Sequence, residues 1–154
     1  MQIFIGIEAN PLLSELPDFD QFLQSTAPPL LIHENIYIYH DPQIADVASD
    51  LLSEADLLEE MHQLIKTEGK AGEDFYDYGF QTGADVFLFA NDLSAFRFTG
   101  GIKVQTEMAL LQLEEHLVFT TVEGIYFTID HYTELVLGIV KAYEVKVEFL
   151  DLDK

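Results

Sequence analysis

The stretch HDPQIADVASDLLSEADLLEE, residues 40–60, predicts the longest helix of the chain. It opens with Asp41 and a proline, a typical helix start, because an aspartate side chain caps the first turn and proline fits the first helical position. From there apolar residues recur at helical spacing as far as Ile65. The sequence therefore predicts a helix that begins after Asp41 and continues toward Gly69, either unbroken or with a restart at Ser53.

The same stretch is strongly acidic. It holds seven carboxylates and neither lysine nor arginine, and residues 1–65 as a whole hold twelve acidic residues and no Lys or Arg. Asp46, Asp50 and Glu54 follow one another at a spacing of four, where like charges on a helix repel by about 0.2–0.5 kcal/mol for each pair. We therefore expect the counter-charge to lie on another protein. The alternative, that this charge only keeps the chain soluble, stays open.

The composition narrows the class of protein. With 28 acidic and 7 basic residues among 154, the net charge is −21, and we expect no direct binding to nucleic acid or to an anionic membrane. Cysteine is absent, which excludes disulfides, thiolate zinc sites and cysteine nucleophiles and agrees with a reducing cytoplasm. The N-terminal residues lack the positive segment of a secretory signal, and no apolar run is long enough to span a membrane. We expect a cytoplasmic protein.

Self-repulsion at this net charge leads to a first testable prediction. The melting temperature is expected to rise between about 20 mM and about 500 mM NaCl, because salt screens the repulsion between carboxylates. Thermal denaturation at several salt concentrations measures it. A flat or falling response would mean that the carboxylates are not crowded in the folded chain.

The other elements indicate an α+β fold with a mixed or mainly antiparallel sheet of about five to seven strands and three to four helices packed against it. We expect one globular domain over residues 1–154 and find no internal repeat. Strands are predicted at residues 2–8 and 36–39, in a hairpin over 85–99, in a second hairpin that turns at Glu123-Gly124, and near the C-terminus. Further helices are predicted after Asn10, Thr106 and Asp130.

No motif in the sequence specifies a reaction. Glu59 and His62 have the spacing of a di-iron ligand pair, but the motif occurs once and His62 is expected on an apolar helix face, so we interpret it as a structural histidine. We predict no catalytic residue, no metal site and no cofactor. Two alternatives stay open: a metal-dependent hydrolase built on the adjacent His40 and Asp41, and a homodimeric interaction domain.

The acidic stretch and a following aromatic segment form the predicted binding surface. Aromatic rings among carboxylates suit anchor residues that face arginine or lysine on a partner. The predicted partner-binding residues are Asp46, Asp50, Glu54, Asp56, Glu60, Phe75, Tyr76, Asp77 and Tyr78.

Two segments resemble a known superfamily. LPDFDQFL (residues 16–23) is similar to the opening motif of the SUKH superfamily, and YGFQTGADVFLFANDL (residues 78–93) is similar to the turn and hydrophobic strand of that group. The resemblance implies an α+β domain and an immunity role against a bacterial toxin, and it implies no site residues. We thus expect a non-catalytic immunity protein that covers the surface of a basic toxin, and a nuclease fits because it has to present Lys and Arg to phosphates.

Overall fold

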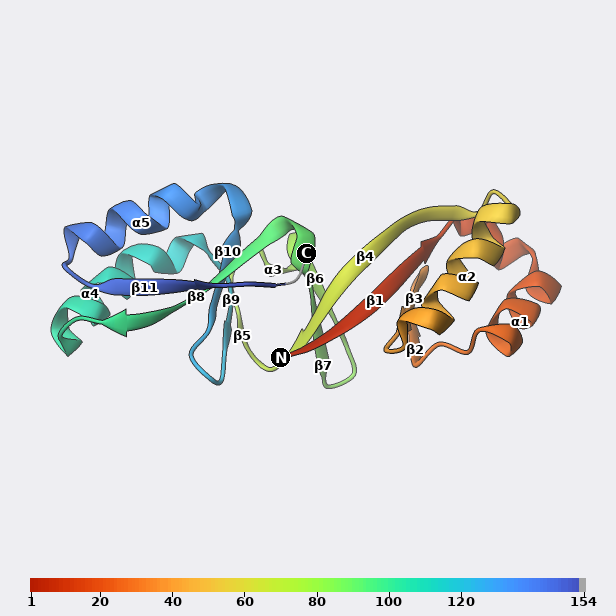
Figure 1. Cartoon of the computed structure of the whole chain (residues 1–154), viewed down its shortest axis with the longest axis horizontal. Helices are drawn as coiled ribbons and strands as arrows, with labels where there is room; N and C mark the ends of the chain where they lie inside the picture. Colours follow the sequence, from red (N-terminus) through yellow and green to blue (C-terminus); the bar gives the residue numbers. More distant parts are fainter. Residues whose placement is uncertain (153–154) are drawn as a thin grey trace. The chain divides into compact units, whose positions relative to one another are not determined.

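The computed structural model describes residues 1–152, which form helices and antiparallel strands in two compact units (Figure 1). The first unit is Met1–Lys66, and the second begins at Thr67. The α+β class is confirmed. The single domain over residues 1–154 stays a prediction, because two compact units can still fold together.

The first unit has the element order βαββαβ. Its four strands lie in the order β2-β3-β1-β4 with every neighbouring pair antiparallel, which is the ferredoxin-like, or split βαβ, arrangement. The elements are β1 (Gln2–Ala9), α1 (Pro17–Thr26), β2 (Leu31–His33), β3 (Ile36–Tyr39), α2 (Pro42–Glu54) and β4 (Leu58–Thr67).

Alternation along β1 decides which side of this sheet the helices cover. Ile5, Ile7 and Ala9 pack in one cluster with residues of α1 and α2, among them Leu23 and Leu52. Residues in between, such as Glu8, point to the other side, because successive side chains of a strand alternate between faces.

Two buried tyrosines of β3 join this sheet to α1. The Tyr37 hydroxyl donates a hydrogen bond to Asp20 at 2.6 Å, and the Tyr39 hydroxyl donates to the Ala27 carbonyl at 2.8 Å. Burial, with the neighbouring Asp20 charge, raises the pKa of Tyr37 far above its usual value and that of Tyr39 to about 12. Both phenols are therefore neutral at physiological pH and add nothing to the negative charge.

The second unit repeats this arrangement from β8 onward. Its five-stranded sheet has the order β11-β8-β10-β9-β5. The last four strands of the chain, β8 to β11, therefore lie in the same order as the four strands of the first unit, and β5 is added at one edge. The elements are β5 (Gly69–Ala71), α3 (Phe75–Tyr78), β6 (Gly79–Thr82), β7 (Asp85–Phe89), β8 (Leu93–Gly100), α4 (Lys103–Leu113), β9 (Leu117–Thr121), β10 (Tyr126–Ile129), α5 (Thr133–Ala142) and β11 (Lys146–Leu150). Helices α4 and α5 share one core cluster with Phe96 of β8.

The two units agree in register as well as in order. Tyr37 of β3 lies opposite Ile7 of β1, and Tyr126 of β10 lies opposite Phe96 of β8. The second helix of each unit also ends in the same way. Asp56 after α2 and Glu144 after α5 both have φ of 57°, and the N–H of the next residue bonds to the carbonyl five positions earlier. The chain thus contains an internal structural repeat that the sequence analysis did not find.

Two of the four predicted helix starts are wrong, since α4 begins at Lys103, before Thr106, and α5 begins at Thr133, after a short 3₁₀ turn at Asp130–Tyr132. The other two starts are right, and one predicted helix end is wrong. Asn10 and Asp41 accept hydrogen bonds from Leu12 and Gln43 as N-caps, as predicted. The predicted extension of the acidic helix to about Gly69, or its restart at Ser53, is wrong. The helix ends at Glu54, and the residues beyond form β4, which pairs along almost its whole length with β1. The predicted 85–99 hairpin is also wrong, since β7 pairs with β6 and β8 with β10 and β11.

One turn of the first unit has a residue in an unfavourable backbone conformation. Glu34, in the two-residue turn between β2 and β3, has φ of 52°, a region that costs an L-residue about 1–2 kcal/mol. Since the Glu34 side chain is exposed, Glu34→Gly is expected to raise the free energy of unfolding by about 0.5–1 kcal/mol, or the melting temperature by about 2–4 °C.

The β9–β10 turn provides a matched control for this prediction. Glu123 is also exposed but lies outside the left-handed region, so Glu123→Gly should lower the melting temperature slightly through chain entropy. Thermal denaturation of both variants measures the difference between their melting temperatures. If Glu34→Gly is no more stable than Glu123→Gly, the turn is not strained.

Candidate functional site

The predicted acidic face exists on α2, but it is shorter than predicted. Asp46, Asp50 and Glu54 are exposed on this helix, whose buried side contacts the sheet. Among residues 1–152, no Lys or Arg forms an ion pair with any of these three. Asp56 is exposed in the turn that follows. Glu60 belongs to β4, so it does not extend this helix face.

The residues of the predicted hydrolase alternative have structural roles. The Asp41 side chain accepts a hydrogen bond from the Gln43 N–H at 2.9 Å and so caps α2. The His40 ring packs against Phe4, with ring centroids 4.9 Å apart. Of the described residues, the group that comes close enough to share a metal ion is a different one, and it includes neither His40 nor Asp41.

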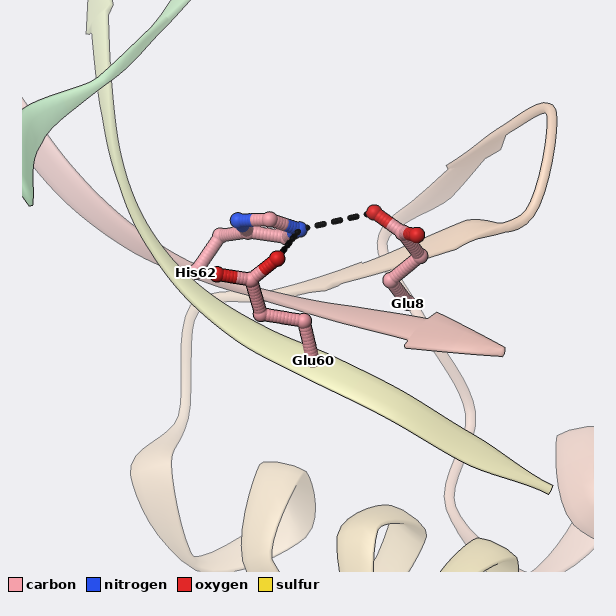
Figure 2. A group of neighbouring side chains, drawn as sticks. All are labelled: Glu8, Glu60 and His62. Carbon is pink, nitrogen blue, oxygen red and sulfur yellow. Dashed lines mark hydrogen bonds and ion pairs between the residues drawn. The ribbon is translucent and has the colours of Figure 1, made fainter. Parts of the chain in front are cut away.

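That group consists of Glu8, Glu60 and His62, which we call the carboxylate–histidine cluster (Figure 2). Glu8 on β1 lies opposite Glu60 on β4, and His62 is two residues further along β4, on the same side of the sheet. Nε2 of His62 is 2.9 Å from Oε1 of Glu8 and 3.9 Å from Oε2 of Glu60. The His62 side chain is 14% exposed, whereas that of Glu60 is 65% exposed. His62 thus lies on a strand beside two carboxylates, not on an apolar helix face.

The aromatic part of the predicted surface lies in the second unit, on and around α3. Phe75 is buried, and its ring packs on Phe119 of β9 with centroids 5.7 Å apart, so it belongs to the core of this unit. Tyr76 is 76% exposed and Asp77 is exposed, while Tyr78 is half-buried. Tyr76 is therefore the member of this set that is accessible as an anchor.

A groove in the second unit was not predicted from the sequence. It has a volume of about 890 Å³ and lies between α4 on one side and β5, β9 and Tyr126 of β10 on the other. We call it the α4–β5 groove. Strand β5 lies at the edge of the sheet, next to β9, and its residues Lys70 and Ala71 line one side of this groove.

The α4–β5 groove combines an apolar surface with an acidic rim. Leu110, Leu111 and Leu117 supply the main apolar side chains. The charged residues around them are one lysine, Lys70, and the four glutamates Glu73, Glu107, Glu114 and Glu115. The groove therefore favours an apolar group that carries positive charge at its edges.

An exposed apolar stripe on α4 borders the groove. Val104, Met108 and Leu111 are three or four residues apart and so share one helix face, and all are exposed, Leu111 by 71%. The opposite face of α4, with Ala109 and Leu113, is buried in the core. A helix that is apolar on its outer side as well indicates a contact surface for another molecule.

No family model, no curated protein and no solved structure matches the chain. The resemblance to the SUKH superfamily therefore stays a prediction. Its two segments form the start of α1 and the β6–β7 hairpin with the turn that follows. No helix within residues 1–152 has the length and hydropathy needed to cross a membrane.

Proposed function

We propose that the chain is a non-catalytic protein that binds a basic protein partner, and that an apolar side chain of this partner, flanked by Lys or Arg, enters the α4–β5 groove. The observation that carries the proposal is the apolar floor of the groove with glutamates on both of its walls. Burial of the apolar anchor supplies affinity, and the glutamates select a cationic partner.

The acidic face of α2 has a different part in this proposal. Asp46, Asp50 and Glu54 are exposed and bear no counter-charge, so they attract a basic protein over a distance of about a Debye length. Such charges mainly accelerate association, whereas a buried anchor slows dissociation.

The narrower form of the proposal is an immunity protein of the bacterial cytoplasm, whose partner is a toxin that acts on nucleic acid. Such an enzyme has to present Lys and Arg to phosphates, and glutamates on this chain compete for the same side chains. A second copy of the chain fits the groove less well, because each copy has a net charge of −21 and the two copies repel one another.

A pair of labelled peptides tests the binding mode. A helical peptide with one leucine face and one lysine face is expected to bind with micromolar affinity and to keep most of it at about 0.5 M NaCl, where charge attraction is screened. An oligolysine of the same charge is expected to lose its binding at that salt concentration. Fluorescence anisotropy measures both. Equal salt sensitivity of the two peptides would contradict an apolar anchor.

A further inference from the structure

The carboxylate–histidine cluster lies at a position that exists in both copies of the internal repeat, but the two copies have different side chains there. In the first unit, the residue after Ile7 is Glu8, and it lies opposite Glu60. In the second unit, the residue after the equivalent Phe96 is Arg97, and it lies opposite Glu148.

The second unit neutralises this position by itself. Nη2 of Arg97 is 3.1 Å and Nε is 3.2 Å from Oε2 of Glu148, so a cation of the chain faces the carboxylate. In the first unit two carboxylates face each other instead, and like charges at opposite positions of neighbouring strands destabilise a sheet. His62 adds an imidazole nitrogen to this pair, and no Lys or Arg of residues 1–152 forms an ion pair with Glu8 or Glu60.

The geometry points to a binding site for a divalent transition-metal ion, with Zn²⁺ as its representative, held by Glu8, Glu60 and His62. The three donor atoms lie within 4.8 Å of one another. Donors around a tetrahedral zinc ion are about 3.3–3.5 Å apart, given bond lengths near 2.0–2.2 Å. The distances of 2.9 Å and 3.9 Å from His62 Nε2 to the two carboxylates lie on either side of this range, so small side-chain adjustments would bring His62 and each carboxylate to the separation of zinc ligands.

The donor set decides the class of metal. Imidazole nitrogen with carboxylate oxygen suits zinc and its first-row neighbours, whereas Ca²⁺ and Mg²⁺ prefer oxygen ligands alone. Three protein ligands leave at least one coordination position for water or for a group of another molecule. The metal takes the place of the hydrogen bond between His62 and Glu8, so His62 has to bind it as neutral imidazole through Nε2.

Isothermal titration calorimetry with ZnCl₂, in about 0.15 M NaCl to screen diffuse attraction to the acidic surface, tests this site. The wild-type chain is expected to bind one zinc ion, and Glu60→Gln and His62→Gln are each expected to weaken binding at least tenfold. Glu60 is exposed, so its variant keeps the test decisive even where His62→Gln disturbs folding. Glu148→Gln, at the equivalent position of the second unit, is the matched control and should leave zinc affinity unchanged.

Three results would overturn the inference. The first is the absence of zinc binding up to millimolar concentration, which would mean that the three side chains only contact one another. The second is equal binding by wild type, Glu60→Gln and His62→Gln, and the third is equal affinity for Ca²⁺ and Zn²⁺. Either would mean that the measured heat comes from cation binding to the acidic surface in general. The basic partner has no part in these measurements, so they stand apart from the proposed function.

Discussion

A Gly69→Ala variant is expected to lose about 2–3 kcal/mol in free energy of unfolding, which corresponds to a fall in melting temperature of roughly 4–12 °C. A Cβ atom at Gly69 would lie 1.9 Å from the Thr120 carbonyl oxygen and 2.7 Å from Cα of Thr121. Both atoms belong to the backbone of β9, so no side chain can rotate away. Strand β5 has to move, and with it one wall of the α4–β5 groove.

Gly138→Ala is the control for this prediction. In α5 a Cβ atom at Gly138 meets no heavy atom within 4 Å, and the same substitution there is expected to stabilise the helix by about 1 kcal/mol. Melting curves of the two variants measure the contrast. A melting temperature of Gly69→Ala at or above that of the wild type would mean that β5 does not lie against β9.

A Glu73→Lys/Glu114→Lys double variant is expected to bind the leucine–lysine peptide about 30-fold more weakly than the wild type. The two residues lie on opposite walls of the groove, are exposed, and have no ion-pair partner among residues 1–152. Each reversal replaces attraction by repulsion, which is worth about 1 kcal/mol at an exposed site, and about 2 kcal/mol corresponds to a 30-fold change in affinity. The loss should appear as faster dissociation as well as slower association, because the reversed charges lie beside the bound apolar anchor.

An Asp46→Lys/Asp50→Lys variant changes the net charge of the chain by the same amount at the α2 face. It is expected to slow association and to leave dissociation almost unchanged. Stopped-flow mixing of the labelled peptide with each variant separates the two rates. The groove is excluded as the binding site if both double variants lose affinity equally.

The features that sequence analysis predicted correctly depend on local chemistry. Asn10 and Asp41 bond to the backbone two residues further on, so these two helix starts follow from neighbouring residues alone. The strand at residues 36–39 and the β9–β10 hairpin were predicted for the same reason, since apolar alternation and a glycine turn are short-range signals.

The end of the acidic helix depends on distant residues. Leu58–Thr67 keeps an apolar spacing that fits a helix, but β1, more than fifty positions away, offers it a full ladder of backbone hydrogen bonds. Asp56 takes a left-handed conformation at the helix end, although glycine is the usual residue there. Neither the pairing nor this cap can be seen in a periodic pattern.

The functional surfaces show the same difference between features set by local sequence and features set by distant residues. The acidic residues of α2 were predicted because charge and helical spacing are properties of the sequence. The α4–β5 groove was missed because β5 joins the sheet at a strand that is far away in sequence. One signal for the repeat was present, the motif Glu-x-Ile-Tyr at residues 34–37 and again at 123–126, and it marks the same turn of both units.

The measurement that tests the central claim most directly is a pull-down from a lysate of the chain's own host cells, washed at about 0.5 M NaCl, with three baits: the wild type, Glu73→Lys/Glu114→Lys and Asp46→Lys/Asp50→Lys. If the α4–β5 groove is the binding site, one basic polypeptide is retained by the wild type and by the α2 variant and is lost from the groove variant. Retention of the same polypeptide by all three baits, or of no polypeptide by the wild type, would contradict it.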